Sequence, residues 1–124
     1  MKIPQGHQSV MPYLILPEAE NFSEFTKQVF DAKVSLTKLR EDGKTIMHSE
    51  LMIGNSTIMF AGATEQFTTQ TAHLFVYVDN ADETYQKALN NGATSVMGLS
   101  DQDYGRTCGV LDPFGNTWWI TSVN

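Results

Sequence analysis

The sequence repeats itself at a nearly constant offset, and this internal repeat constrains the fold more than any other feature. Gly54–Asn55 recurs as Gly115–Asn116, an offset of 61 from residue 54 to residue 115, and Ala32 recurs as Ala93 at the same offset. A half of about 60 residues is too small to bury a secure core by itself. We therefore expect two similar halves that share their stability, with a ligand cleft where they meet.

The composition is that of one ordinary globular domain of 124 residues, 41% hydrophobic and 18% charged. No run of about 20 apolar residues predicts a membrane span, and the N-terminus lacks the apolar core of a signal peptide. The net charge of −6 without any run of Lys or Arg argues against nucleic-acid binding. The single cysteine, Cys108, has no internal disulfide partner, so we expect a cytoplasmic protein.

Each half of the sequence predicts a strand, a helix and then three strands. Helical spacing joins Phe22, Phe25 and Val29, Asp79 or Asn80 can cap the second helix, and Gly92 can end it. The predicted strands are 10–16, 33–40, 46–53 and 57–61, then 73–78, 94–97, 107–111 and 117–123; the predicted helices are 21–30 and 79–89, and 102–106 is a loop. The fold class is therefore α+β, a single domain spanning 1–124. It is built from two paired βαβββ modules, about 10–66 and 67–124, that form curved mixed sheets around a concave cleft, with helices on the outer face.

Alternation along the strand 73–78 divides its side chains between two faces. Its three aliphatic residues suit the helix side, so His73, Phe75 and Tyr77 point to the opposite, concave face. Polar and aromatic groups therefore gather where a ligand would lie.

Several segments, taken together in their order and spacing, resemble the vicinal oxygen chelate superfamily. This is the fold of glyoxalase I, the extradiol dioxygenases, and the bleomycin- and fosfomycin-resistance proteins. The resemblance rests on the paired modules, the strand HLFVYV followed by Asp79, the helix end Asn91–Ala93, and Asp112–Asn116. The segments similar to its PhnB-like branch are Pro12–Leu14, Ile46–Gly54, and Tyr104–Arg106 before Asp112–Trp119, so the resemblance covers nearly the whole chain from Val10 on.

The resemblance implies where a divalent metal would bind, because enzymes of this superfamily hold one with four side chains from the first and last strand of each half. In this sequence those positions fall on His73 and Trp119 in the second half, and near Pro12 and on Ile58 in the first. Only His73 is a usual ligand, since indole and alkyl groups do not bind such ions. We therefore expect no four-ligand metal site and no cofactor.

A rearranged metal site stays open as the alternative. His48 and Glu50 lie two residues apart on one predicted strand and share a face, so they can join His73 in a His/Glu/His site if that face is the concave one. The other interpretation is a hydrogen-bonded pair near a strand edge. The register of the hairpin at Gly54–Asn55 determines whether His48 and Glu50 lie on the concave face of the sheet. His7 lies in the N-terminal arm and is expected to be exposed.

Further residues are candidates for contacts with a ligand. Trp119 offers a stacking surface in place of a metal ligand, although an indole that only fills the core explains it as well. Tyr104 and Arg106 precede the last hairpin at a predicted pocket rim, where Arg106 can hold a carboxylate or phosphate, or else pair with Asp101 or Asp103. Cys108 is predicted to be structural. The candidate ligand-binding residues are His73, Phe75, Tyr77, Trp119, Tyr104, Arg106 and Ile58.

Three functions follow from this sequence. The first is a metal-independent small-molecule-binding protein of the PhnB-like type. The second is a metal-dependent lyase or isomerase of the glyoxalase type that uses the rearranged site, so whether the protein is an enzyme stays open. The third is a protein that dimerises and serves a partner. A homodimer is expected in any case, because the edge strands need covering.

Overall fold

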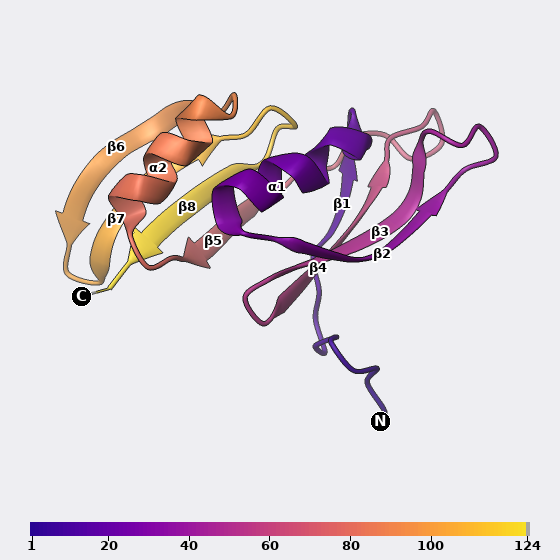
Figure 1. Cartoon of the computed structure of the whole chain (residues 1–124), viewed down its shortest axis with the longest axis horizontal. Coiled ribbons are helices and arrows are strands. Elements are labelled where there is room, and N and C mark those ends of the chain that lie inside the picture. The colour runs from indigo at the N-terminus through magenta and orange to yellow at the C-terminus, as the bar shows by residue number, and fades with distance from the viewer. Residues whose placement is uncertain (124) are drawn as a thin grey trace. The chain divides into compact units, whose positions relative to one another are not determined.

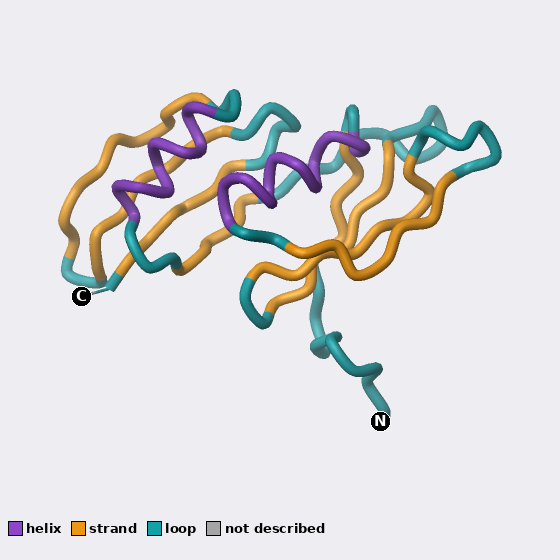
Figure 2. The backbone as a smooth tube through the Cα atoms, viewed as in Figure 1, coloured by secondary structure: helices purple, strands orange, loops and turns teal. Residues whose placement is uncertain are grey.

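The computed structural model describes residues 1–123, and their contacts divide them into two compact units (Figures 1 and 2). Unit 1 consists of residues 1–27 and 31–71, and unit 2 consists of residues 28–30 and 72–123. Each unit contains one four-stranded mixed sheet.

Unit 1 follows the predicted order of a strand, a helix and three strands. Its elements are β1 (Tyr13–Leu16), a single 3-10 turn η1 (Ala19–Asn21), α1 (Phe22–Phe30), β2 (Lys33–Leu39), β3 (Ile46–Ile53) and β4 (Ser56–Gly62), and only the last three residues of α1 are grouped with unit 2. The sheet order is β1-β4-β3-β2, with β1 parallel to β4 and the other pairs antiparallel.

Unit 2 repeats this arrangement. Its elements are β5 (His73–Tyr77), α2 (Ala81–Asn90), β6 (Thr94–Gln102), β7 (Gly105–Leu111) and β8 (Thr117–Ser122). The sheet order is β5-β8-β7-β6, again with one parallel pair, β5 and β8. Helix α2 packs across β6, β7 and β8 (Figure 1). The predicted α+β class with two strand–helix–three-strand modules is confirmed.

The predicted helical faces are buried. Phe22 at the start of α1 contacts Phe60 of β4 edge to face, with 5.0 Å between ring centroids, in the core of unit 1. Phe30, whose contacts place it in unit 2, lies 4.5 Å from the Trp118 ring of β8. Phe25 and Val29, predicted from the same spacing, are also buried.

Both ends of α2 are stabilised as the sequence predicts. The Asn80 side-chain oxygen accepts a hydrogen bond of 3.1 Å from the backbone N–H of Glu83, which satisfies a free donor of the first turn. Gly92 adopts a φ of 97° just after the helix, a conformation that a side chain would disfavour.

The turn between β7 and β8 is organised by a buried carboxylate. Asp112 is 3% exposed, and its two oxygens accept four hydrogen bonds of 2.8–3.0 Å. The donors are the backbone N–H groups of Phe114 and Asn116, the Asn116 side-chain amide and the Trp118 indole N–H. The Asp-Pro-Phe-Gly-Asn segment therefore fixes the start of β8, the strand that carries Trp119.

Two predicted boundaries are wrong. The predicted loop at 102–106 is a tight hairpin, because β6 extends to Gln102, which pairs with Gly105 and leaves only residues 103–104 in the turn. Strand β6 lies at the sheet edge and is exposed along most of its length, so it lacks the apolar alternation that marks a strand. At the other end of the chain, β1 begins at Tyr13 rather than at residue 10.

In the part of the chain that the structure describes, no helix is long and apolar enough to cross a membrane.

Candidate functional site

One surface of unit 2 gathers five of the seven predicted ligand-binding residues. We call it the aromatic face, and it consists of His73, Phe75, Tyr77, Tyr104 and Trp119. The Phe75 ring lies 5.2 Å from the Tyr77 ring and 6.4 Å from the Tyr104 ring. These three rings are each at least half exposed, and contiguous exposed aromatic rings are typical of an interaction surface.

His73 and Trp119 lie together at one end of this face. The Trp119 indole N–H donates a hydrogen bond of 3.2 Å to His73 Nδ1, and the two rings stack with centroids 6.1 Å apart. A neutral imidazole that accepts at Nδ1 carries its proton on Nε2. In that state His73 presents an N–H donor to the surroundings and no free lone pair for a metal ion.

The Trp119 ring lies over the neighbouring strand β7 because the residue of β7 opposite Trp119 is a glycine. Gly109 of β7 pairs with Trp119 of β8, and a Cβ built on Gly109 would lie 2.5 Å from Trp119 Cζ3. The missing side chain makes the space for the indole. Gly109 is therefore a determinant of the aromatic face, and the sequence does not single it out because glycine in a strand gives no periodic signal.

Arg106 does not lie on the aromatic face. Gly109 of β7 pairs with Trp119 and shares its face, and Arg106 lies three residues before Gly109 on the same strand. Because side chains alternate along a strand, Arg106 lies on the opposite face, which α2 covers. There Nε and Nη2 donate to the two carboxylate oxygens of Asp82 at 2.8 and 3.1 Å, and Nη1 lies 3.3 Å from Asp101. The Asp82 carboxylate raises the pKa of Arg106. Of the two interpretations that the sequence left open, the structure therefore contains the ion pair with Asp101, and it adds Asp82 as a second partner that the sequence did not indicate.

Ile58 also lies on the opposite face from the one predicted. Ile58 is buried and lies two residues before Phe60 on β4, so the two side chains share a face. Phe60 contacts Phe22 of α1, which places that face on the α1 side of the sheet. Ile58 lies on the helix side of its sheet, as Trp118 of β8 does in unit 2, so the offset between these strands is an even number rather than the 61 seen at the turn glycines. A shift of one residue reverses the face. The face of β4 that corresponds to the face of Trp119 therefore holds Thr57, Met59 and Ala61.

A polar network lies on the face of the unit 1 sheet turned away from Phe22, and it consists of Tyr13, His48, Glu50 and His7. The Tyr13 hydroxyl lies 3.0 Å from His48 Nδ1, and His48 Nε2 lies 2.8 Å from one oxygen of Glu50. His7 Nε2 lies 2.7 Å from the other oxygen. The face of His48 and Glu50, which the sequence left open, is therefore the face of Tyr13.

This network also attaches the N-terminal arm to the sheet. His7 is only 21% exposed at its side chain, so the expectation that it is exposed is wrong. The next residue, Gln8, bonds the backbone of Thr57 through both its amide oxygen and nitrogen, and the Thr57 hydroxyl bonds the Gly6 carbonyl. Hydrogen bonds from His48, and secondly from His7, hold the pKa of Glu50 below its ordinary value of 4.5, against the opposing effect of burial.

The residues present do not fit the four-ligand metal site that the resemblance implies. In unit 1, the residues of β1 and β4 on the face turned away from Phe22 are Tyr13, Ile15, Thr57, Met59 and Ala61, so these positions together with His73 and Trp119 hold one imidazole and no carboxylate. Within residues 1–123, no group of three or more His, Cys, Asp or Glu side chains is placed to hold a metal ion. In the polar network, the imidazole nitrogens point at the oxygens of Glu50 rather than at a common centre.

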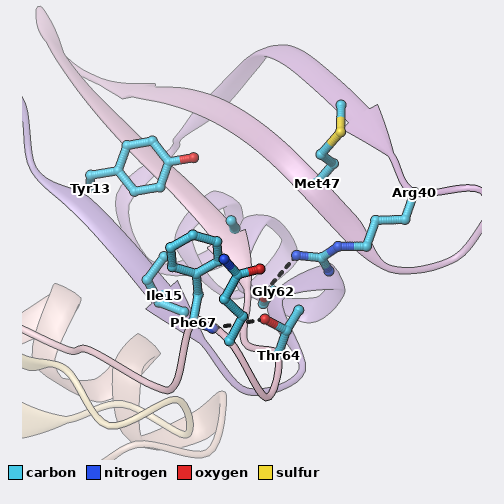
Figure 3. Close-up of a pocket in the computed structure, with 9 residues that line it drawn as sticks. Tyr13, Ile15, Arg40, Met47, Gly62, Thr64 and Phe67 are labelled. Atoms are coloured by element: carbon cyan, nitrogen blue, oxygen red, sulfur yellow. Dashed lines mark hydrogen bonds between the residues drawn. The ribbon is translucent and has the colours of Figure 1, made fainter.

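Unit 1 also contains a pocket that the sequence did not reveal. Its volume is about 560 Å³, and its walls include Tyr13, Ile15, Arg40, Met47 and Phe67 (Figure 3). This volume lies in the range of small-molecule sites. The one signal in the sequence was an aromatic residue, Phe67, within a polar loop.

Comparison with known proteins supports the family suggested by these features. A profile of the Glyoxalase/Bleomycin resistance protein/Dioxygenase superfamily matches residues 12–120. An uncharacterised protein of Mycobacterium bovis is 32% identical in an alignment that covers 89% of this chain and 80% of that protein.

Solved structures show the same fold. A putative 3-demethylubiquinone-9 3-methyltransferase, a PhnB protein from Bacillus cereus, has a TM-score of 0.72 at 15% identity, covering 94% of this chain and 100% of that chain. The fosfomycin resistance protein FosX from Mesorhizobium loti has a TM-score of 0.68 at 14% identity, covering 98% and 95%. The paired modules, the matched profile and the shared fold together show that the chain belongs to the glyoxalase/bleomycin resistance protein/dioxygenase superfamily.

Proposed function

We propose that this protein binds a small aromatic molecule on the aromatic face of unit 2, without the four-ligand metal site of the superfamily's metal enzymes. The observation that carries the proposal is the hydrogen bond from the Trp119 indole to His73 Nδ1. It occupies the lone pair of the one imidazole found at an expected ligand position, and it puts an indole where those enzymes have a carboxylate.

The surrounding rings support stacking as the mode of recognition. Phe75 and Tyr104 are 52% and 51% exposed, and their rings are tilted toward each other, so a flat molecule can contact several ring faces at once. His73 Nε2–H and the hydroxyl groups of Tyr77 and Tyr104 supply polar contacts that orient the molecule. A face built in this way suits sequestration of a ligand rather than its chemical conversion.

The first test is the metal content of the purified protein after incubation with zinc, nickel, manganese or iron(II). We expect background metal only. About one tightly held metal ion per chain, lost on His73→Ala, would contradict the proposal and favour a metal-dependent lyase or isomerase.

The second test is a thermal-shift screen with neutral bicyclic aromatic compounds. Because a ligand of the folded state stabilises it by mass action, a true ligand raises the melting temperature progressively as its concentration exceeds the dissociation constant. Phe75→Ala is expected to abolish that rise. Phe67→Ala removes an equally exposed ring from unit 1, 60% exposed, and is the matched control that keeps the rise. No hit in the screen, or equal loss in both variants, would argue against the aromatic face.

We also propose that the protein forms a homodimer through exposed edge strands. Every residue of β2 is exposed, including Val34, Leu36 and Leu39, and β2 lies at the edge of its sheet. An exposed edge with apolar side chains favours pairing with another chain. Light scattering after size-exclusion chromatography is expected to give twice the mass of 13.8 kDa, and a monomer mass would refute the dimer.

A further inference from the structure

The pocket of unit 1 has an apolar wall that is unusually open to solvent. Phe67 is 60% exposed and Met47 49% exposed, and Ile15 lines the same space. The backbone of Phe67 is held by its own loop, since its N–H donates to the Thr64 hydroxyl at 2.9 Å and its carbonyl accepts from the Thr64 N–H at 2.8 Å (Figure 3). An exposed ring on a fixed backbone beside a cavity is suited to contact the body of a small apolar molecule.

Arg40 places a positive charge at this pocket. Its guanidinium extends toward β4, where Nη2 donates to the Gly62 carbonyl at 2.9 Å (Figure 3). Gly62 allows this approach, because a Cβ there would lie 3.1 Å from Nη1. Among residues 1–123, no carboxylate forms an ion pair with Arg40, whereas Arg106 in unit 2 has two such partners. Most of the donors of Arg40 are therefore available to an anion.

Asp42, whose carboxylate interacts electrostatically with Arg40, makes its hydrogen bonds within its own turn. Asp42 accepts from the backbone N–H groups of Lys44 and Thr45 at 2.9 Å, and from the Thr45 hydroxyl at 2.8 Å. These hydrogen bonds lower the pKa of Asp42, with Arg40 as the smallest of the causes. Asp42 therefore acts mainly on the turn and leaves the guanidinium open to a carboxylate from outside.

Tyr13 adds a hydrogen-bond acceptor whose orientation is set by the polar network. The ionised Glu50 carboxylate only accepts, so His48 must donate from Nε2, and a neutral His48 then accepts at Nδ1 from the Tyr13 hydroxyl. The Tyr13 oxygen keeps its lone pairs for a donor in the pocket. Tyr13 is both the end of this chain of bonds and a wall residue of the pocket.

We propose that this pocket binds a small carboxylic acid with an apolar, preferably aromatic, body and a hydroxyl or amino group. The carboxylate pairs with Arg40, the body contacts Phe67, Met47 and Ile15, and the donor bonds to Tyr13. A single guanidinium matches one planar carboxylate in charge and geometry, whereas a dianionic phosphate would keep one unneutralised charge. This site uses no residue of the aromatic face, so it stands or falls independently of the proposed function.

The test is titration of the full-length protein with para-hydroxyphenylacetate, followed by calorimetry and by chemical-shift changes of backbone amides. We expect saturable binding with the largest shifts at Gly62 and Phe67. Para-hydroxyphenylacetamide, which lacks only the charge, is expected to bind about tenfold or more weakly, and para-hydroxyphenyl phosphate is expected to bind more weakly than the carboxylate.

Variants locate the site. Arg40→Gln is expected to weaken binding about ten- to a hundredfold, and Lys44→Gln, which removes one charge from the same hairpin, is expected to leave it unchanged. Phe67→Ala, at an exposed position that does not threaten folding, is expected to weaken binding severalfold, while Phe75→Ala has no effect. Absence of binding at millimolar probe, equal affinity in Arg40→Gln and wild type, or shifts confined to unit 2 would each overturn the proposal.

Discussion

Gly109 and Trp119 are complementary across the β7–β8 pair: the indole occupies the space that any other residue at position 109 would fill. The same indole donates to His73 Nδ1. One backbone position without a side chain therefore controls the geometry of two residues of the aromatic face.

Gly109→Ala is expected to displace the indole and break its hydrogen bond to His73. Its Cβ would lie 2.5 Å from Cζ3 and 2.8 Å from Cε3 of Trp119, closer than carbon atoms approach without movement. Overpacking of this kind destabilises by about 1–3 kcal/mol. The indole N–H resonance of Trp119 reports the lost bond, and chemical denaturation gives the stability change.

Gly98→Ala is the matched control for that substitution. Gly98 lies in β6 of the same unit, and a Cβ at this position would have nothing within 4 Å, so the stability of the variant is expected to stay within about 0.5 kcal/mol of wild type. An unchanged Trp119 resonance in Gly109→Ala would show that the indole adapts and that the glycine is not required.

Asp112→Ala is expected to destabilise the protein by about 2–4 kcal/mol, because it leaves the buried Trp118 indole N–H and the Asn116 amide without an acceptor. Urea denaturation measures the loss. Asp103→Ala removes an exposed carboxylate from the neighbouring hairpin turn and should change stability by less than about 0.5 kcal/mol. Similar effects of the two variants would mean that the Asp112 hydrogen bonds contribute little.

Glu50 is expected to make stability depend on pH in the acidic range. Its pKa in the folded state lies below the ordinary 4.5, because His48 and then His7 donate hydrogen bonds to the carboxylate. Its contribution is therefore complete above the unfolded-state pKa and is lost as the pH falls through the lower folded-state pKa.

The measurement compares wild type with Glu50→Gln. We expect the variant to be less stable by about 1–3 kcal/mol at neutral pH, and this difference should shrink as the pH falls from about 5.5 to about 3. Glu65→Gln, at an exposed position, is expected to show neither effect. A difference that stays constant through this range would rule out ionised Glu50 as its source.

Cys108 is expected to be nearly inert toward thiol reagents in the folded protein. The side chain is fully buried in β7, and burial, followed by the charge of Asp82, raises the pKa of the thiol to about 11. The thiolate that reacts is therefore scarce at about pH 8. Reaction with an aromatic disulfide reagent should be at least about a hundredfold slower than in urea-unfolded protein, and comparable rates would show that β7 opens readily.

The fold could be predicted because its signals are local. Alternation along β5 is strong enough to assign the faces of His73, Phe75 and Tyr77 correctly, since aliphatic and aromatic residues strictly alternate there. The cap at Asn80 and the glycine at position 92 are likewise set by their own neighbours in sequence.

Other features could not be predicted because they depend on contacts distant in sequence. The face of Ile58 depends on one residue of offset between a turn and a strand, and the direction of Arg106 depends on where β7 begins. His7 meets Glu50 across 43 residues, and Arg40 meets Gly62 across 22. Such contacts leave no periodic pattern, so only the folded chain reveals the polar network and the pocket.

The attachment of the N-terminal arm to Glu50 has a practical consequence for how this protein is produced. A polyhistidine affinity tag placed before Met1 would tether additional imidazoles a few residues from His7, beside a carboxylate and a second histidine. Nickel carried over from purification would bind the imidazoles of the tag, and those imidazoles could also compete with His7 for the Glu50 carboxylate. Metal found on such a preparation would report the tag and not the protein, so the metal content has meaning only for the chain without it.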